Sequence, residues 1–379
     1  MNINRNFDSL RDDELGEVIK TSYLPLLDVL DDLELKTTLF FTGFSLETLE
    51  RESPNVLEKT RDLIQRGIVE LGNHTYGHPI IPLISNDDLK LHINRSKILE
   101  RKIFGAVAKC FYPPEFCTDP SLPMVLQNEG FEWMLLHNSN YLGAYGHTLK
   151  DVFKIGEVRG VLESRMLALT AYGDADEWIR GQIHGVFEGS VDPQRFASSL
   201  IETINRQTNE CINPVVCLYT DSETPYFNKD SSNLYPVDHF RKAIEFLLKN
   251  GNLRSVSASD LLSDQTLPKI DLRLKMRETY KPFDLWVSGS EKLDRLIHEA
   301  RLTIDKVLES STNSAKIDSM IRHYLLAQGS DARSVLSERR MRVMKIGKLN
   351  RHGNLERTRK AYEHAIIAKI MAQEILDGK

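Results

Sequence analysis

The sequence contains no proline after Pro282. Because proline interrupts helices, a long stretch without it permits continuous ones, and the apolar residues here recur at helical spacing, as at Leu293, Ile297 and Ala300. We therefore expect residues 269–379 to form an all-helical C-terminal domain and residues 1–268 to form a separate first domain.

Cysteine is scarce, and no two cysteines form a CxxC pair. This excludes a dense disulfide framework and predicts reduced thiols in a cytoplasmic protein. The first seven residues contain no apolar segment typical of a signal peptide, and no apolar run approaches about 18 residues, so no membrane association is expected. The four cysteines are Cys110, Cys117, Cys211 and Cys217.

Charge of one sign is also limited, because the formal net charge is only −5. This balance gives no general argument for binding nucleic acid or an anionic membrane. One segment, Arg333 to Lys360, carries ten Lys and Arg against two Glu. Without aromatic residues or a recognisable motif around it, such a segment predicts a solvated face rather than a nucleic-acid site.

Apolar strand patterns alternate with helical patterns through the first domain. The β-branched and aromatic segment 36–42 predicts a buried strand, a helix interrupted at Pro54 follows over 45–65, and another strand begins at Ile68. This order predicts an α/β fold with a parallel sheet and helices outside it. Further strands are expected at 3–7, 106–112, 131–136, 152–161, 166–170 and 214–219, and further helices at 11–33, 85–103, 119–127, 174–182, 192–208, 239–250 and 257–263.

Two histidines, His74 and His78, follow the strand that begins at Ile68. Polar groups at the end of a parallel strand are typical of α/β active sites. With Asp8 as a third ligand, the pair would make a hydrolytic metal site. The third ligand has little support in the sequence, so we favour histidines that hydrogen-bond sugar hydroxyls or neighbouring loops without a metal.

Two carboxylates also follow apolar strands. Glu115 comes after two prolines that fix the backbone, and Asp221 follows Tyr219, with Glu223 two residues further on. Cleavage of a glycosidic bond needs a pair of acids, one to attack the sugar carbon and one to protonate the departing oxygen. Acids at strand ends often cap the helix that follows, and Asp221 alone could equally do so, but the two acids together favour a catalytic use.

Several of these stretches resemble glycoside hydrolase family 57. Residues 66–84, RGIVELGNHTYGHPIIPLI, look like its second signature region, and Pro113-Pro-Glu115 and Asp221-Ser-Glu-Thr224 resemble its third and fourth. Leu326-Ala-Gln-Gly-Ser-Asp331 is similar to its fifth region, and upstream Ser22–Leu27 and Thr42-Gly43 resemble the same family. The resemblance therefore extends over nearly the whole chain, in the family's order.

The resemblance implies a distorted (β/α)7 barrel with a helical C-terminal domain. It also implies retaining hydrolysis or transfer on an α-glucan or oligosaccharide substrate without a metal or cofactor, with Glu115 as nucleophile and Asp221 as acid/base. We expect Glu115 to be held ionised by donors such as the two histidines. We expect the pKa of Asp221 to be raised by burial and by the like charges of Glu115 and Glu223. The residues expected to bind substrate are His74, His78, Glu70, Tyr76, Glu223 and Asp331.

The sequence departs from the family pattern in two places. The family's first region, a strand with a histidine, would fall at or before Met1, where Asn2 stands, and Ala332 stands where an aromatic is common. Polysaccharide deacetylases share the HxxxHP pattern but need an arginine near Pro113, which this chain lacks. A metal-dependent deacetylase and a degenerate glucan-binding homologue are the two alternatives.

Overall fold

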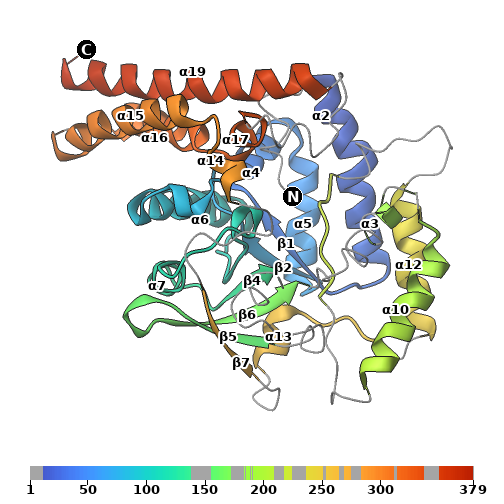
Figure 1. Cartoon of the computed structure of the whole chain (residues 1–379). Helices are drawn as coiled ribbons and strands as arrows, with labels where there is room; N and C mark the ends of the chain where they lie inside the picture. Colours follow the sequence, from blue (N-terminus) through green and yellow to red (C-terminus); the bar gives the residue numbers. More distant parts are fainter. Residues whose placement is uncertain are drawn as a thin grey trace.

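The computed structural model describes residues 12–137, 155–171, 183, 185–187, 189, 191–208, 217–223, 236–250, 253–263, 269–274, 283–310, 314–336 and 350–378. Seven described strands form one sheet near the centre of the molecule, and a group of helices is stacked at one end of it (Figure 1). The strands are β1 (Thr37–Phe41), β2 (Val69–Asn73), β3 (Cys110–Phe111), β4 (Trp133–His137), β5 (Ile155–Arg159), β6 (Arg165–Ala171) and β7 (Lys269–Arg273).

The strand order in the sheet is β1-β2-β3-β4-β6-β5-β7. β1 to β4 and β6 are parallel, β5 runs antiparallel to β6, and β7 is parallel to β5. The expected α/β fold with a largely parallel sheet is therefore confirmed. Among the described strands no pairing joins β1 to β7, so the closed (β/α)7 barrel stays a prediction.

The helices around the sheet begin and end close to where local sequence signals place them. Pro25 and Pro54 lie in the first turns of α3 and α5, and the Ser85 side chain caps α6 by accepting from Asp88 N. The helices are α2 (Asp12–Val18), the π-helical turn η1 (Ile19–Tyr23), α3 (Leu24–Asp32), α4 (Gly43–Glu52), α5 (Pro54–Gln65), α6 (Asn86–Phe104), α7 (Leu122–Asn128), α10 (Pro193–Thr208), α12 (Pro236–Asn250) and α13 (Ala258–Ser263), with 3-10 turns η2 (Ile81–Leu83), η3 (Pro114–Phe116) and η5 (Val161–Glu163).

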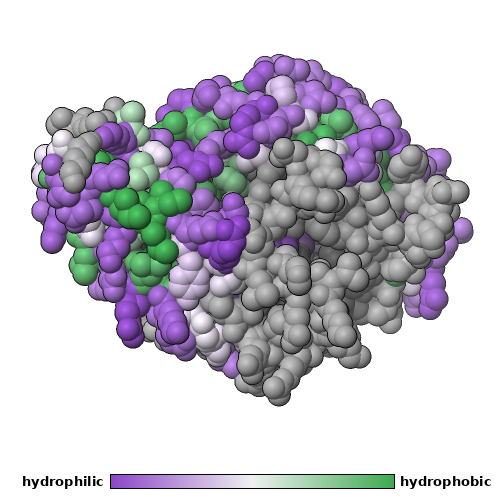
Figure 2. Space-filling model, turned by 90° about the horizontal axis from the view of Figure 1, so that it is seen from above, coloured by the Kyte–Doolittle hydropathy of each residue, from purple (hydrophilic) through white to green (hydrophobic). Residues whose placement is uncertain are grey.

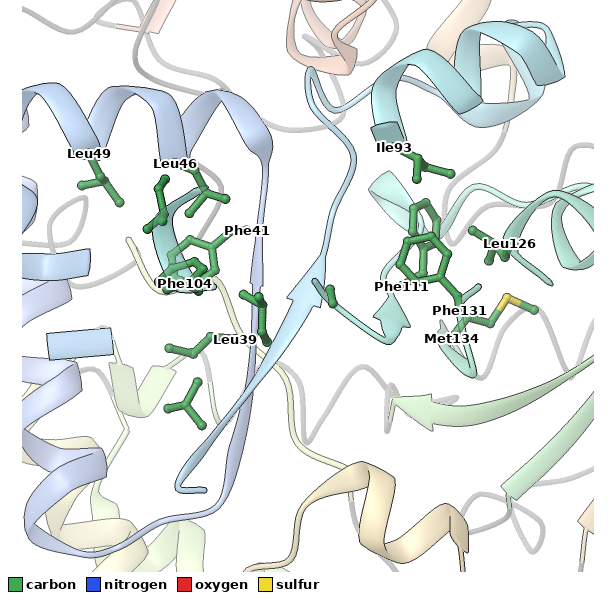
Figure 3. Packing of buried hydrophobic residues seen from close by; sticks show 14 of the residues in the cluster. Leu39, Phe41, Leu46, Leu49, Ile93, Phe104, Phe111, Leu126, Phe131 and Met134 are labelled. Carbon is green, nitrogen blue, oxygen red and sulfur yellow. The ribbon is translucent and has the colours of Figure 1, made fainter. Parts of the chain in front are cut away.

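The sheet is buried on both faces, because successive side chains of a strand point to opposite sides. In β4, Met134 and Leu136 join the large core beneath α3 to α7, whereas Trp133 and Leu135 pack toward α13. Figure 3 shows part of the large core, in which Phe41 lies beside Phe104, and Phe111 beside Phe131. An apolar strand without polar alternation, as β4 is, fits this arrangement.

The C-terminal helices stack at one end of the sheet (Figure 1). The long α19 packs on α15, α16 and α17, which confirms helices after Pro282 within the described residues. β7, however, follows residue 268 and pairs with β5, so this part of the predicted helical segment is a strand of the sheet. The helices are α14 (Asp284–Val287), α15 (Glu291–Ser310), α16 (Ser314–Ala327), α17 (Ser330–Leu336) and α19 (Asn350–Leu376).

Where the view from the α19 side shows described residues, they are mostly hydrophilic, with smaller hydrophobic areas between them (Figure 2). Ile366, Ile367 and Ile370 of α19 are among the exposed apolar residues. In the part of the chain that the structure describes, no helix is both long and apolar enough to cross a membrane. The expected strand at 3–7 and helix at 174–182 lie outside the described residues; of the expected strand at 214–219, residues 217–219 are described and are not in a strand.

Candidate active site

The carboxyl ends of three neighbouring parallel strands lie at one edge of the sheet. Phe41 lies beside Asn73, and Asn73 beside Phe111, in the register of β1 to β3. The segments that follow these three strands therefore leave the sheet side by side. This edge is where α/β proteins with parallel strands place their active sites.

The segment after β2 carries both histidines and is held rigidly. The Asn73 amide donates to Glu100 Oε1 over 2.7 Å and its oxygen accepts from Thr75 N, so a buried pair fixes the start of the turn. Burial raises the pKa of Glu100, and the bonds from Ala108 N and Asn73 oppose that shift. Thr75 and His78 both adopt positive φ, a conformation uncommon in non-glycine residues that needs such support.

His74 is oriented by Tyr112, the residue that follows β3. The two rings stack with centroids 4.2 Å apart, and His74 Nδ1 lies 2.7 Å from the Tyr112 carbonyl oxygen. Since a carbonyl only accepts, Nδ1 carries the proton. Burial, helped by the nearby charge of His78, lowers the pKa of His74 well below its usual value. His74 is therefore neutral, and its Nε2 is an acceptor suited to a hydroxyl group.

His78 is connected to Glu115 through Ser330, the first residue of α17. His78 Nδ1 lies 2.7 Å from Ser330 Oγ, and the Ser330 hydroxyl donates to Glu115 Oε1 over 3.4 Å. The rings of His74 and His78 have centroids 4.5 Å apart. The structure thus brings together the two predicted histidines and the predicted nucleophile, with a serine between them.

The backbone at Glu115 is strained. Glu115 has φ 54° and ψ 22°, and Phe116 also has a positive φ, immediately after Pro113 and Pro114. Non-glycine residues in this region cost about 1–3 kcal/mol each and cluster at functional sites. Two backbone hydrogen bonds hold the turn: Phe116 N donates to Pro113 O, and Cys117 N donates to Pro114 O. The sequence motif of two prolines before an acid therefore corresponds to a fixed, unusual presentation of the Glu115 side chain.

Asp221 reaches the same edge through aromatic packing. The Phe116 ring contacts His137, the last residue of β4, and Tyr219, with centroids 5.1 Å apart in each case. Asp221 itself is exposed, whereas Ser222 and Glu223 are buried. The expectation that Asp221 is buried is therefore wrong: the chain turns the following two residues inward instead.

Tyr23 of the π-helical turn lies near these acids. Burial raises the pKa of Tyr23 well above its usual value, and the charges of Glu223 and then Asp221 raise it further. Its hydroxyl is buried and finds no hydrogen-bond partner among the described residues, and the same is true of the Ser22 hydroxyl. π-Helical turns are often found at functional sites, and here one places Tyr23 near the segment that carries Asp221.

Glu70 and Tyr76 have other partners. The Glu70 carboxylate accepts from Trp133 Nε1 over 3.2 Å and also binds Ser259 of α13. Tyr76 is fully buried at the border with the C-terminal helices, where its hydroxyl donates to Glu47 over 2.6 Å and Arg95 lies over its ring. These contacts give both residues packing roles, and their binding of substrate stays a prediction.

The remaining predicted positions fall in two groups. Asp331 is half-buried and directly follows Ser330 in α17, so it lies next to the site. Asn2 and Asp8 lie outside the described residues. Among the residues that are described, no three His, Cys, Asp or Glu side chains are grouped so that they could hold a metal ion. His74 and His78 each use Nδ1 in a protein contact.

Sequence reasoning missed Tyr112, His92, Gln328 and Ser330. His92 of α6 accepts from Gly77 N through Nδ1 and contacts Gln328 Oε1 through Nε2, at 3.1 and 2.8 Å. Gln328 and Ser330 belong to the 326–331 stretch whose family resemblance pointed only to Asp331. The family resemblance of this stretch was therefore a signal for Gln328 and Ser330, but their partners, His92 and His78, lie more than 200 residues away in the sequence.

The family model of glycosyl hydrolase family 57 matches residues 4–168, which include β1 to β4, both histidines and Glu115. Over this part of the chain, the sequence is similar to a family 57 domain. The chain is 29% identical over 138 residues to a 4-alpha-glucanotransferase of Thermococcus litoralis and 29% identical over 133 residues to an alpha-amylase of Pyrococcus horikoshii. The matches cover 36% and 35% of this chain, but only 21% of the length of each relative.

Solved structures of family 57 enzymes share the fold over most of the chain. The crystal structure of the T. litoralis 4-alpha-glucanotransferase matches with a TM-score of 0.71 at 19% identity, covering 93% of this chain and 56% of that one. A family 57-type branching enzyme from P. horikoshii matches with a TM-score of 0.74 at 14% identity, covering 94% of this chain and 84% of that one. The shared fold thus extends beyond residue 168, to the C-terminal helices.

Proposed function

We propose that this chain is a family 57 enzyme, a retaining glycoside hydrolase or transglycosylase acting on α-glucans, with Glu115 as nucleophile and Asp221 as acid/base. The observation that carries the proposal is the strained presentation of Glu115, beside His74 and His78, at the edge that the Tyr219–Asp221 segment also reaches. Two relatives are named 4-alpha-glucanotransferase and alpha-amylase, and these names support α-glucans as the substrate class.

The proposed reaction has two steps. The Glu115 carboxylate attacks the anomeric carbon while Asp221 gives its proton to the departing glycosidic oxygen, which leaves a glycosyl ester on Glu115. Asp221, now ionised, then takes a proton from water or from a sugar hydroxyl, and that oxygen displaces Glu115. Water gives hydrolysis, and a sugar hydroxyl gives transfer.

The exposure of Asp221 fits a group that must exchange its proton with both substrate and solvent. His74 fits a different role, since a neutral ring cannot neutralise Glu115 and can accept from a sugar hydroxyl through Nε2. Donation to Glu115 comes instead from Ser330, which accepts in turn from His78. The cytoplasmic location stays a prediction.

The test compares Glu115→Ala and Asp221→Ala on an aryl α-maltooligoside with a good leaving group and on maltooligosaccharide. Glu115→Ala should lose turnover on both, and added azide should give a product of inverted anomeric configuration because azide occupies the vacated face. Asp221→Ala should lose about 100- to 10,000-fold on maltooligosaccharide and far less on the aryl substrate, whose leaving group needs no proton.

Glu132→Ala is the matched control, because Glu132 is an exposed acid immediately before β4 that pairs with Lys109. If both site variants match the wild type on both substrates, the pair is not catalytic. A wild type inert on every α-glucan would instead favour a degenerate glucan-binding homologue. Acetate release from an acetylated glycan that a chelator abolishes would favour the deacetylase.

A further inference from the structure

Ser330 comes from the C-terminal helices but is hydrogen-bonded to the segment after β2 that carries both histidines. Its backbone N donates to His78 O over 2.8 Å, and the preceding Gly329 forms an antiparallel bridge with Pro79. Ser330 is fully buried. Two backbone contacts and the packing around it therefore fix the position of its hydroxyl without any contribution from the side chain.

The directions of the two side-chain contacts follow from the chemistry of the partners. An ionised carboxylate only accepts, so the single hydroxyl proton of Ser330 goes to Glu115 Oε1, 3.4 Å away. Ser330 Oγ must then accept from His78, 2.7 Å away, and His78 Nδ1 carries a proton. The chain of donors runs from His78 through Ser330 to Glu115.

This direction matters for the proposed reaction. A nucleophile must be ionised and aligned before attack, and a hydrogen bond to its charged form favours both. Bonds at catalytic carboxylates are often long before substrate binds and shorten in the complex, which fits 3.4 Å. Because the donor is a buried hydroxyl on a fixed backbone, it points toward Glu115 whenever the C-terminal helices are docked on the sheet region.

We propose that Ser330 is a positioning residue for Glu115, whose ionised carboxylate it holds by a hydrogen bond that His78 orients. The role rests on the proposed function, in which Glu115 attacks the sugar. It also means that the site is complete only when the C-terminal helices are docked, because α17 supplies the donor.

The test uses Ser330→Cys, which nearly keeps the volume but has only a weak donor, Ser330→Ala, which has none, and Ser330→Thr, which keeps the hydroxyl. On an activated aryl α-maltooligoside, the Ser330→Cys and Ser330→Ala variants should have a kcat about 10-fold lower with little change in KM. This loss corresponds to one hydrogen bond to a charged group. The acidic limb of the kcat/KM profile should move up by about half to one pH unit, and Thr should restore it.

A second readout does not depend on turnover. In protein with carbon-13 at the glutamate carboxyls, the resonance that Glu115→Gln removes belongs to Glu115. Its titration midpoint should rise in Ser330→Ala and Ser330→Cys and return in Ser330→Thr. Ser290→Ala is the control, because Ser290 is equally buried among the same helices and binds Asp294 and Arg333 instead.

An unchanged midpoint in folded Ser330→Ala or Ser330→Cys would overturn the proposal, as would an equal shift in Ser290→Ala. If the wild type cleaves no α-glucan, the proposed function fails. The carbon-13 titration then still decides the hydrogen bond by itself, so the two failures are distinguishable.

Discussion

At the scale of single residues, the site depends on close approach of the backbone. Gly77, between the two histidines, is an example: a Cβ there would lie 2.6 Å from the Leu325 carbonyl oxygen and 3.1 Å from the His92 ring. The first of these atoms is backbone, which cannot rotate away. Gly77 is therefore required because α16 packs directly on the histidine segment, and its φ plays no part.

Gly77→Ala should lower the free energy of unfolding by about 1–3 kcal/mol, because the added methyl group has no space. Urea denaturation followed by circular dichroism measures this value. Gly16→Ala is the matched control, since Gly16 lies in α2 with nothing within 4 Å of a Cβ, and it should raise stability by about 0.5–1 kcal/mol. Equal effects at both positions would show that the close approach of α16 is not real.

At the scale of elements, α6 connects the histidine segment to the C-terminal helices. His92, fully buried on α6, accepts from Gly77 N through Nδ1, so its proton is on Nε2, where it donates to Gln328. Gln328 in turn donates to Asp88, at the start of α6. Burial lowers the pKa of His92 to about 4, against 6.5 for a free histidine. The chain of bonds requires the neutral ring.

The pH dependence of stability follows from this shift. The folded-state pKa is depressed, so His92 gives its full contribution above about pH 6.5, and the contribution is lost as the pH falls from there through about 4. The loss should approach about 3 kcal/mol. In His92→Gln the fall between these pH values should be smaller by that amount, as measured by urea denaturation at each pH.

His298→Gln, the same substitution at an exposed position of α15, controls for the loss of one histidine. It should reproduce the wild-type curve. A His92→Gln curve parallel to the wild type would show that His92 does not change its proton affinity on folding.

At the scale of the whole molecule, polar groups join the sheet region to the C-terminal helices. Asp88 of α6 pairs with Arg301 of α15 and accepts from Tyr324 of α16 over 3.0 Å. Glu47 of α4 accepts from Tyr76 and pairs with Arg322. The same interface holds Ser330 against His78. The contacts that dock the C-terminal helices on the sheet region therefore also assemble the proposed site.

Asp88→Asn should destabilise the protein by about 1.5–3 kcal/mol, because it removes the charged acceptor that Arg301 and Tyr324 share and leaves Arg301 paired with the more exposed Asp305. Asp87→Asn is the control: Asp87 shares the first turn of α6, but its side chain is 73% exposed and pairs with the neighbouring Lys90. Its effect should stay below about 1 kcal/mol. Thermal unfolding by calorimetry compares the two, and equal losses would mean that the helix terminus, and not Arg301, sets the effect of Asp88.

The sequence by itself determined the order and type of most described elements. β1, β2 and β4, the Ser85 cap of α6 and the helices after Pro282 depend on apolar spacing and on residues that start or stop an element, and both are local. The position of Glu115, after a strand and two prolines, was also local. These features could therefore be read without knowing how the chain folds back on itself.

Only the tertiary structure decided which groups meet. Ser330 and Glu115 are 215 residues apart and touch because α17 docks on the histidine segment. The same packing buries Tyr76 against Glu47, while the turn after Tyr219 leaves Asp221 exposed. β7 joins the sheet through pairing with β5. Each outcome depends on the free energy of contacts between distant segments, which no local pattern in the sequence records.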